Sequence, residues 1–208
     1  MKRIIALLLT LISVMALPVG VLAEDDVSDF LWWAEEEIQE ETVAPMSEDT
    51  DLNTLDLRTP CGFTEEQLEK ALRHKLKGYA WAYLKAEKEY GINAVFLASV
   101  SALESGWGRH CFKPNNIFGY GRKSFDSYED CIDFVASRLE KNYLSEDGRY
   151  HHGTTIDAVN KSYNGRKVWA KSVKNIFGIM LRKVNDAIAA AEETTLDTLD
   201  TFEIFEFD

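Results

Sequence analysis

The chain of 208 residues lacks most of the motifs by which common enzyme classes are recognised. It has no Ser-His-Asp order, no phosphate-binding loop, no nucleotide motif and no internal repeat. Its three cysteines, Cys61, Cys111 and Cys131, stand at no metal-ligand spacing, which excludes a zinc site of the usual kind. The adjacent pair His151 and His152 is expected in a turn, since neighbouring side chains point apart on regular elements. We therefore predict no metal site and no cofactor.

Basic residues are missing from both ends of the chain. Residues 24–57 hold 13 acidic side chains and no Lys or Arg, and residues 191–208 hold seven and none. The part between them, residues 58–190, has 15 acidic and 21 basic side chains, an excess of six positive charges. A basic domain suits an anionic polymer, including nucleic acid, although solubility alone is an equal explanation.

The first 23 residues lack the length of a membrane span. Lys2 and Arg3 precede an apolar run over residues 4–17, and the sequence Val-Leu-Ala ends at Ala23. The run is shorter than the roughly 20 residues that a spanning helix needs, so we expect a secretory signal peptide and no membrane span after its cleavage. Export argues against a nucleic-acid partner. In an exported protein the three cysteines predict one disulfide and one free thiol, in any of three pairings, with a fully reduced trio as the alternative.

The charge pattern predicts three parts after the signal peptide. Residues 24–57 form an acidic, flexible leader, in which Phe30 to Trp33 could make a short amphipathic helix. Residues 58–190 form one globular domain, and residues 191–208 form an acidic tail that is either frayed or clipped onto the domain like a strand.

Helical periodicity runs through the central part, and no strand pattern of consequence is present. Thr64 and Gln67 make a capping box ahead of Leu68, Leu72 and Leu76, and the pattern resumes after Gly78 and stops at Gly91. Asn93 caps an apolar helix over residues 94–103, residues 109–125 form a loop, and Ser127 caps a helix that continues to Tyr143. The last helix carries an apolar stripe from Trp169 to Ile188. The fold class is all-α.

Glu104 is the candidate for chemistry. It ends the apolar helix just before a sequence with two glycines, Gly106 and Gly108. A carboxyl group in dry surroundings tends to keep its proton, as a general acid for a glycosidic bond must. A structural salt bridge to Arg109, or to another base at the helix end, would explain a glutamate at this position equally well.

Several segments, taken in order, resemble the bacterial glucosaminidase-domain autolysins, family 73 of the glycoside hydrolases. Residues 102–108 read Ala-Leu-Glu-Ser-Gly-Trp-Gly, and residues 115–119 read Asn-Asn-Ile-Phe-Gly. The match continues through Ser-Phe-Asp-Ser-Tyr-Glu at 124–129, Asn-Tyr-Leu at 142–144, Ser-Tyr at 162–163 and Trp-Ala at 169–170. The resemblance covers roughly residues 59–187. It implies a lysozyme-like fold and places Glu104 at the position of the catalytic acid.

The resemblance also implies roles for other residues. Tyr163 would contact the N-acetyl group or the attacking water, with core packing as the alternative. Asn116, Phe118, Tyr120 and Trp107 would bind sugar, although Asn116 could instead brace its loop and packing is the stronger expectation for Trp107 and Trp169. The second acid of several relatives lies in an insertion that this chain lacks. Asp126 and Glu129 are the nearest acids in sequence, and Glu146 and Asp147 in a following turn are further candidates. The substrate's own acetamido group could instead act as nucleophile, with inversion through a water molecule held by Asp126 or Tyr163 as the competing route.

The implied activity is hydrolysis of the β-1,4 bond of peptidoglycan glycan strands on the N-acetylglucosamine side, outside the cytoplasm, by a monomer without a cofactor. Anionic wall polymers are further expected partners. A lytic transglycosylase or muramidase on the same fold is one alternative. A wall-sugar-binding module that has lost catalysis is another.

Overall fold

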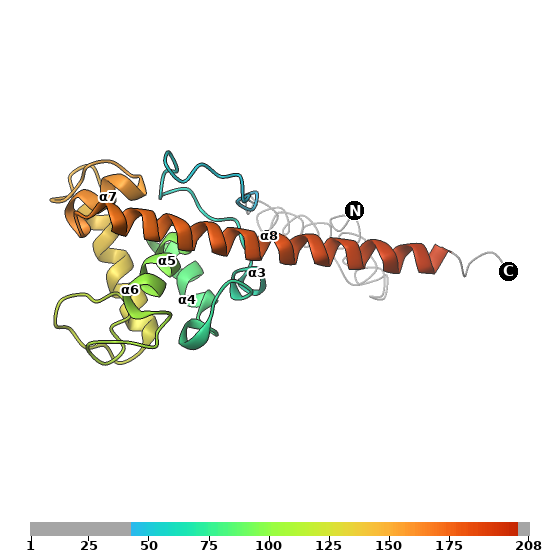
Figure 1. Cartoon of the computed structure of the whole chain (residues 1–208), viewed down its shortest axis with the longest axis horizontal. Helices are drawn as coiled ribbons and strands as arrows, with labels where there is room; N and C mark the ends of the chain where they lie inside the picture. The colour runs from blue at the N-terminus through green and yellow to red at the C-terminus, as the bar shows by residue number, and fades with distance from the viewer. Residues whose placement is uncertain (1–42, 204–208) are drawn as a thin grey trace, which may run out of the picture. The chain divides into compact units, whose positions relative to one another are not determined.

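The computed structural model describes residues 43–203, and all of its regular elements are helical (Figure 1). Their order is α3 (Glu65–Glu69), a 3₁₀ turn (His74–Leu76), α4 (Ala80–Tyr90), α5 (Ala94–Ser105), α6 (Tyr128–Leu139), a π-helical turn (Glu140–Leu144), α7 (Ile156–Tyr163) and α8 (Lys167–Glu203). No strand occurs in this range, which confirms the all-α class. The predicted signal peptide and the Phe30 to Trp33 patch lie outside the described residues.

The buried helix α5 is the centre of the domain. It packs against α8 and α4, and α4 in turn packs against α6. All residues from Ala94 to Ala102 are buried, so this helix has no polar face and is held by neighbours on every side. None of the helices in residues 43–203 combines the length and apolar character needed to cross a membrane.

The predicted helix caps are confirmed. Thr64 and Gln67 form the capping box of α3. Asn93 accepts a hydrogen bond from the backbone at the start of α5, and Ser127 does the same for α6. Gly91 ends α4 in the left-handed conformation, with φ of +60°. Each cap satisfies backbone groups that a helix end leaves unpaired.

Three leucines predicted on one helix face are buried but do not share a helix. Leu68 lies in α3, Leu72 follows the end of that helix, and Leu76 lies in the 3₁₀ turn. The chain turns at His74, a residue other than glycine with φ of +52°, which no α-helix accommodates. Burial was therefore predicted correctly for these positions, whereas the continuous helix was wrong.

Two further boundaries differ from the prediction. The helix capped by Ser127 ends at Leu139, and Tyr143 lies in the π-helical turn that follows. Residues 191–203, expected to be frayed or strand-like, continue α8. The apolar stripe of α8 is confirmed, with Trp169, Val173, Met180 and Val184 buried.

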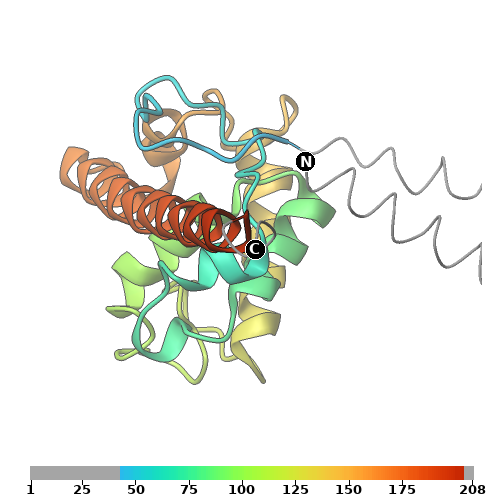
Figure 2. The same cartoon turned by 90° about the vertical axis from the view of Figure 1, so that its right-hand side faces the viewer.

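The start of the domain is earlier than predicted. Residues 43–57 were expected to belong to a flexible leader, but they are part of the compact unit that begins at Val43. Met46 and Leu57 are buried, and the Leu57 N–H donates to the Thr154 carbonyl at 2.9 Å. Figures 1 and 2 both show this segment lying along α8, where Asn185 donates to the Met46 carbonyl. The segment adds four acidic and no basic side chains, so the positive excess falls from six to two.

The predicted disulfide is wrong for this structure, because Cys61, Cys111 and Cys131 are all free. Cys61 and Cys131 are buried. The backbone N–H of Cys61 donates to Glu87 and its thiol contacts the same carboxylate. Burial raises the pKa of the Cys61 thiol far above its usual range and that of Cys131 to about 11. These two thiols therefore stay protonated.

Candidate active site

Glu104 lies in the last turn of α5, directly before the chain reverses. The Ser105 hydroxyl donates to the Ser101 carbonyl at 2.6 Å and accepts from the Gly108 N–H at 2.7 Å. Gly106 ends the helix in the left-handed conformation, with φ of +57°. The side chain of Ser105 thus links the helix to the glycine-containing turn, so that Glu104 stands on a rigid support.

The surroundings of Glu104 differ from the prediction. The carboxylate was expected in a dry environment at the end of an apolar helix, but Glu104 is exposed. Its neighbours Ala102 and Ser105 are buried. Because successive residues of a helix are turned by about 100°, the carboxylate leaves the core that these neighbours enter. The helix does not by itself desolvate this group.

The indole of Trp169 holds one oxygen of the carboxylate. Trp169 lies in the first turn of α8, is 6% exposed, and donates from Nε1 to Glu104 Oε1 at 2.7 Å. The prediction that Trp169 is a packing anchor accounts for its burial but not for this bond. A buried tryptophan needs an acceptor for its N–H, so the expected burial of Trp169 already indicated that a polar group lies next to it.

Tyr163, at the end of α7, completes the immediate group. Its ring centroid lies 4.9 Å from that of Trp169, with 36° between the planes, and its hydroxyl donates to the Phe118 carbonyl at 3.4 Å. Burial raises the pKa of the Tyr163 phenol, and the nearby Glu104 carboxylate raises it further. The phenol therefore stays protonated and can act as a hydrogen-bond donor.

Two more tyrosines extend these rings into a row. The ring centroids of Tyr143 and Tyr163 are 6.0 Å apart, and those of Tyr143 and Tyr150 are 5.2 Å apart. Tyr150 is 38% exposed, and His151 Nδ1 bonds to the Tyr143 carbonyl at 2.9 Å. We call Tyr150, Tyr143, Tyr163 and Trp169 the aromatic row. Such rings suit the apolar faces of sugars.

Gly119 lies on another side of the carboxylate. Its φ is +62°, and a Cβ at this position would lie 3.7 Å from Glu104 Oε2. The loop that carries Gly119 is held by Asn116, which is buried. The Asn116 amide donates to the carbonyls of Tyr120 and Lys123 and accepts from the Tyr120 N–H at 2.8 Å.

These contacts correct two predicted sugar-binding residues. The bonds of Asn116 are used within its own loop, so the alternative that it braces this loop is the one the structure supports. Phe118 is 2% exposed and belongs to the core. Tyr120 is 39% exposed and packs edge-on against Phe134, with centroids 5.3 Å apart, so its ring remains accessible.

The two remaining predicted residues do not contact Glu104. Trp107 is partly buried, has φ of +65°, and has the Arg73 guanidinium 5.2 Å from its ring centroid. Asp126 is exposed beside the cap of α6, and its backbone carbonyl accepts from Asn115 at 2.8 Å. Within residues 43–203, no hydrogen bond or ion pair joins a second carboxylate to Glu104 or Tyr163. The same residues contain no group of three or more His, Cys, Asp or Glu placed to hold a metal ion.

Comparison with known proteins relates this site to one family. Residues 80–177, which include Glu104, Tyr163 and Trp169, match the glucosaminidase family, described as mannosyl-glycoprotein endo-beta-N-acetylglucosaminidase. Two similar proteins, from Streptococcus pneumoniae serotype 4 and from strain R6 of the same species, both carry the name "Putative endo-beta-N-acetylglucosaminidase".

Both relatives are larger proteins. Each is 25% identical to this chain over 154 residues, a region that covers 66% of this chain but 23% of the first relative and 21% of the second. The all-helical architecture agrees with the lysozyme-like fold class that the sequence motifs implied. Residues 80–177 of the chain therefore form a glucosaminidase domain, the domain of a glycoside hydrolase.

Proposed function

We propose that this protein is an exported peptidoglycan hydrolase that cleaves the β-1,4 bond on the N-acetylglucosamine side, with Glu104 as general acid. The observation that carries the proposal is the exposed Glu104 carboxylate, held by the Trp169 indole beside the protonated Tyr163. The names of the two relatives support the type of bond. The predicted signal peptide and the accessible end of the aromatic row at Tyr150 support a polymeric sugar substrate outside the cytoplasm.

The two oxygens of Glu104 have different tasks in this proposal. Oε1 accepts the Trp169 N–H at 2.7 Å, so Oε2, on the side of Gly119, is the oxygen that carries the proton. Glu104 transfers this proton to the glycosidic oxygen as the bond from that oxygen to the anomeric carbon breaks. Water is excluded from the carboxyl group by the bound strand, because the protein alone leaves Glu104 exposed.

The nucleophile in this proposal is the substrate. The carbonyl oxygen of the 2-acetamido group attacks the anomeric carbon and forms a cyclic oxazolinium ion. Water then opens this ring, and Glu104 takes a proton from the water, which restores the carboxylic acid and leaves the product with retained configuration. The sequence supports this route, because only residues 120–123 stand where several relatives carry the insertion with a second acid. When the strand binds, the Tyr163 hydroxyl exchanges its long bond to the Phe118 carbonyl for one to the acetamido group, which it orients as a donor.

Inversion through a water molecule held by Tyr163 or Asp126 is the competing route. The two routes give opposite anomers of the new reducing end, which proton NMR distinguishes in the first minutes of digestion. We expect the β-anomer first. Initial release of the α-anomer would exclude the acetamido route, and a loss of activity in Asp126→Asn would then identify the residue that holds the water.

Purified sacculi test the function itself. We expect turbidity to fall with the wild-type protein and to stay constant with Glu104→Gln, which keeps the shape of the side chain but cannot deliver a proton. Glu66→Gln, an exposed position on α3 with 84% of its side-chain area accessible, is the matched control. Mass spectrometry of the products should find reducing N-acetylglucosamine ends. Reducing muramic acid ends would indicate a muramidase, and anhydro ends a lytic transglycosylase.

A sugar-binding module without catalysis is the second candidate. It is favoured by the same missing insertion, which carries the second acid in several relatives. A wild-type protein that sediments with sacculi but never lowers their turbidity, and that binds as well as Glu104→Gln, would establish this candidate in place of the hydrolase.

A further inference from the structure

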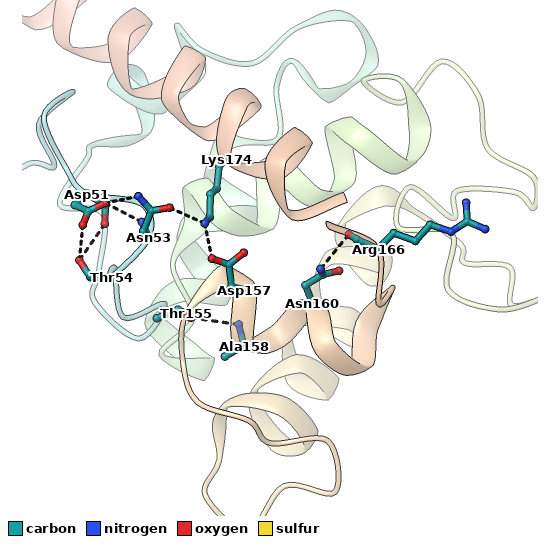
Figure 3. A network of polar contacts seen from close by, with 9 residues as sticks. All are labelled: Asp51, Asn53, Thr54, Thr155, Asp157, Ala158, Asn160, Arg166 and Lys174. Carbon is teal, nitrogen blue, oxygen red and sulfur yellow. Dashed lines mark hydrogen bonds and ion pairs between the residues drawn. The ribbon is translucent and has the colours of Figure 1, made fainter. Parts of the chain in front are cut away.

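Asn160 is a buried amide that fixes the turn between α7 and α8. The residue is 7% exposed, and its Nδ2 donates to the Arg166 carbonyl at 3.0 Å (Figure 3). Its own backbone carbonyl accepts from the N–H groups of Gly165 at 2.7 Å and Asn164 at 3.3 Å. Three hydrogen bonds from one residue thus define the path of the chain from the end of α7 to the start of α8.

The carbonyl that Asn160 binds is shared with Trp169. The backbone N–H of Trp169 donates to the Arg166 carbonyl at 3.0 Å, which forms the first turn of α8. The side chain of the same Trp169 donates to Glu104 at 2.7 Å. A continuous series of hydrogen bonds therefore runs from the Asn160 amide through the Arg166 carbonyl and Trp169 to the carboxylate.

The direction of the Asn160 amide follows from its surroundings. Reversing it would place Oδ1 against the Arg166 carbonyl, oxygen against oxygen, so nitrogen must face that carbonyl. In the present direction Oδ1 has no hydrogen-bond partner in the structure. Replacement by alanine removes this unpaired buried acceptor, and the Arg166 carbonyl keeps its bond to the Trp169 N–H. The cost in stability should therefore be small.

An ion pair between α7 and α8 lies farther from the turn that joins the two helices. Lys174 binds Asp157 at 2.6 Å and Asn53 at 2.9 Å, while Thr155 caps α7 (Figure 3). This contact attaches the helices to each other and to the segment before α3. It does not involve the turn that precedes Trp169, so it provides a comparison for Asn160.

We propose that Asn160 is a positioning residue of the active site, which sets the start of α8 so that the Trp169 indole meets the Glu104 carboxylate. The inference rests on the proposed function, in which that carboxylate delivers the proton. Asn160 touches no substrate in this scheme. Its loss should lower the rate of the chemical step without weakening substrate binding.

Kinetics on soluble glycan strands, freed of their stem peptides, test the inference. We expect Asn160→Ala to lower kcat about tenfold with little change in KM. Asn160→Asp, which lacks the N–H donor, should behave in the same way. Asn164→Ala is the matched control, because it removes an exposed side chain from the same turn, and Asp157→Asn weakens the outer contact; both should keep kcat near the wild-type value. Thermal unfolding of each variant shows that it is folded.

A double-mutant cycle identifies the route of the effect. In a Trp169→Phe background, Asn160→Ala should cause no further loss of kcat, since its action passes through the indole N–H. Independent, multiplying losses would overturn the proposal, as would a rise in KM with an unchanged kcat.

A readout without catalysis separates the two proposals. In protein with ¹⁵N-labelled tryptophan, the indole N–H signal of Trp169, assigned by its absence in Trp169→Phe, should move upfield in Asn160→Ala and stay in place in Asn164→Ala. An unmoved signal overturns the role of Asn160 even if the enzyme is active. A moved signal in a protein that does not clear sacculi supports the positioning role and refutes the proposed function.

Discussion

Gly119 lies beside the oxygen of Glu104 that is left free by Trp169. Its φ of +62° is in the left-handed region, and an added methyl group would lie 3.7 Å from Oε2. Gly121, in the same loop, has φ of +54° and open space around the position of a Cβ. The two glycines share the backbone conformation, but the carboxylate is within reach at Gly119 alone.

Alanine at these two glycines should therefore have different effects. Each substitution should lower the free energy of unfolding by about 1 kcal/mol, because of the left-handed backbone. Gly119→Ala should in addition lower kcat/KM on glycan strands by about tenfold, since the methyl group occupies the approach to Oε2. Urea unfolding and steady-state kinetics measure the two quantities. Equal kcat/KM for both variants would show that Oε2 does not deliver the proton.

Single residues were predictable where their sequence position alone determines their place. Glu104 was singled out by its position at the end of an apolar helix, and Tyr163 by the motif around it. The structure places these two side chains close to each other. The exposure of Glu104 was not predictable, because it depends on the angle at which the last turn of α5 leaves the core. Asn116 and Phe118 were misassigned because their roles depend on partners within the loop. The bond from Trp169 joins positions that are 65 residues apart in the sequence.

At the scale of elements, α5 depends on the residue that caps its start as much as on its last turn. Asn93 is buried, its side chain accepts from the Phe96 N–H at 3.0 Å, and its amide donates to the Thr59 carbonyl at 2.8 Å. The cap thus joins the central helix to the segment that leads into α3.

Asn93→Ala should lower the free energy of unfolding by about 2 kcal/mol, because it removes a cap and leaves the Thr59 carbonyl without this donor. Ser127→Ala, at the partly exposed cap of α6, should cost about 1 kcal/mol. Urea denaturation of the two variants beside the wild type gives both values. A smaller loss for Asn93→Ala than for Ser127→Ala would contradict the importance of the bond to Thr59.

Elements were predictable where caps and apolar spacing agree, as for α4, α5 and α8. The helix α7 was not identified, because its eight residues from Ile156 to Tyr163 make only about two turns, too few for a helical period to be recognised. The π-helical turn after α6 was also missed. Its wider turn gives Tyr143 a direction that a spacing of 3.6 residues does not describe, and Tyr143 there meets Tyr163.

For the molecule as a whole, stability includes a partly buried acid remote from the site. The Glu87 carboxylate accepts from the N–H groups of Cys61 at 2.9 Å and Ala94 at 2.7 Å, and burial raises its pKa above the usual 4.5 despite these bonds. At a pH between the unfolded and folded pKa values, the folded protein holds a proton that the unfolded chain has released.

The free energy of unfolding should therefore fall as the pH rises from 4.5 through the raised pKa of Glu87. Glu87→Gln should remove this decline, because the amide keeps an acceptor for the two N–H groups and carries no charge. Urea unfolding at pH values from about 4 to about 7 measures the slope for both proteins. Identical slopes would mean that Glu87 does not titrate in this range.

The segment 43–57 should be required for the fold. A chain that begins at Arg58 lacks the buried Met46 and Leu57 and the bond from Leu57 to Thr154. Compared with a chain that begins at Val43, its free energy of unfolding should be lower by about 2–5 kcal/mol for each missing buried side chain. A loss of this size is comparable to the whole stability of a typical domain. Circular dichroism during heating tests this. Equal melting temperatures would restore the boundary predicted at residue 58.

The accessibility of the proton donor in the free protein bears on how digestion would proceed. If the protein has the proposed function, the bound strand itself must shield the exposed Glu104 from water. A long strand shields this carboxyl group better than a disaccharide does. Each cut shortens the pieces that remain, so the rate per bond should decline as the products become smaller. The protein would then release large fragments and leave small ones intact, and would limit its own action without any inhibitor.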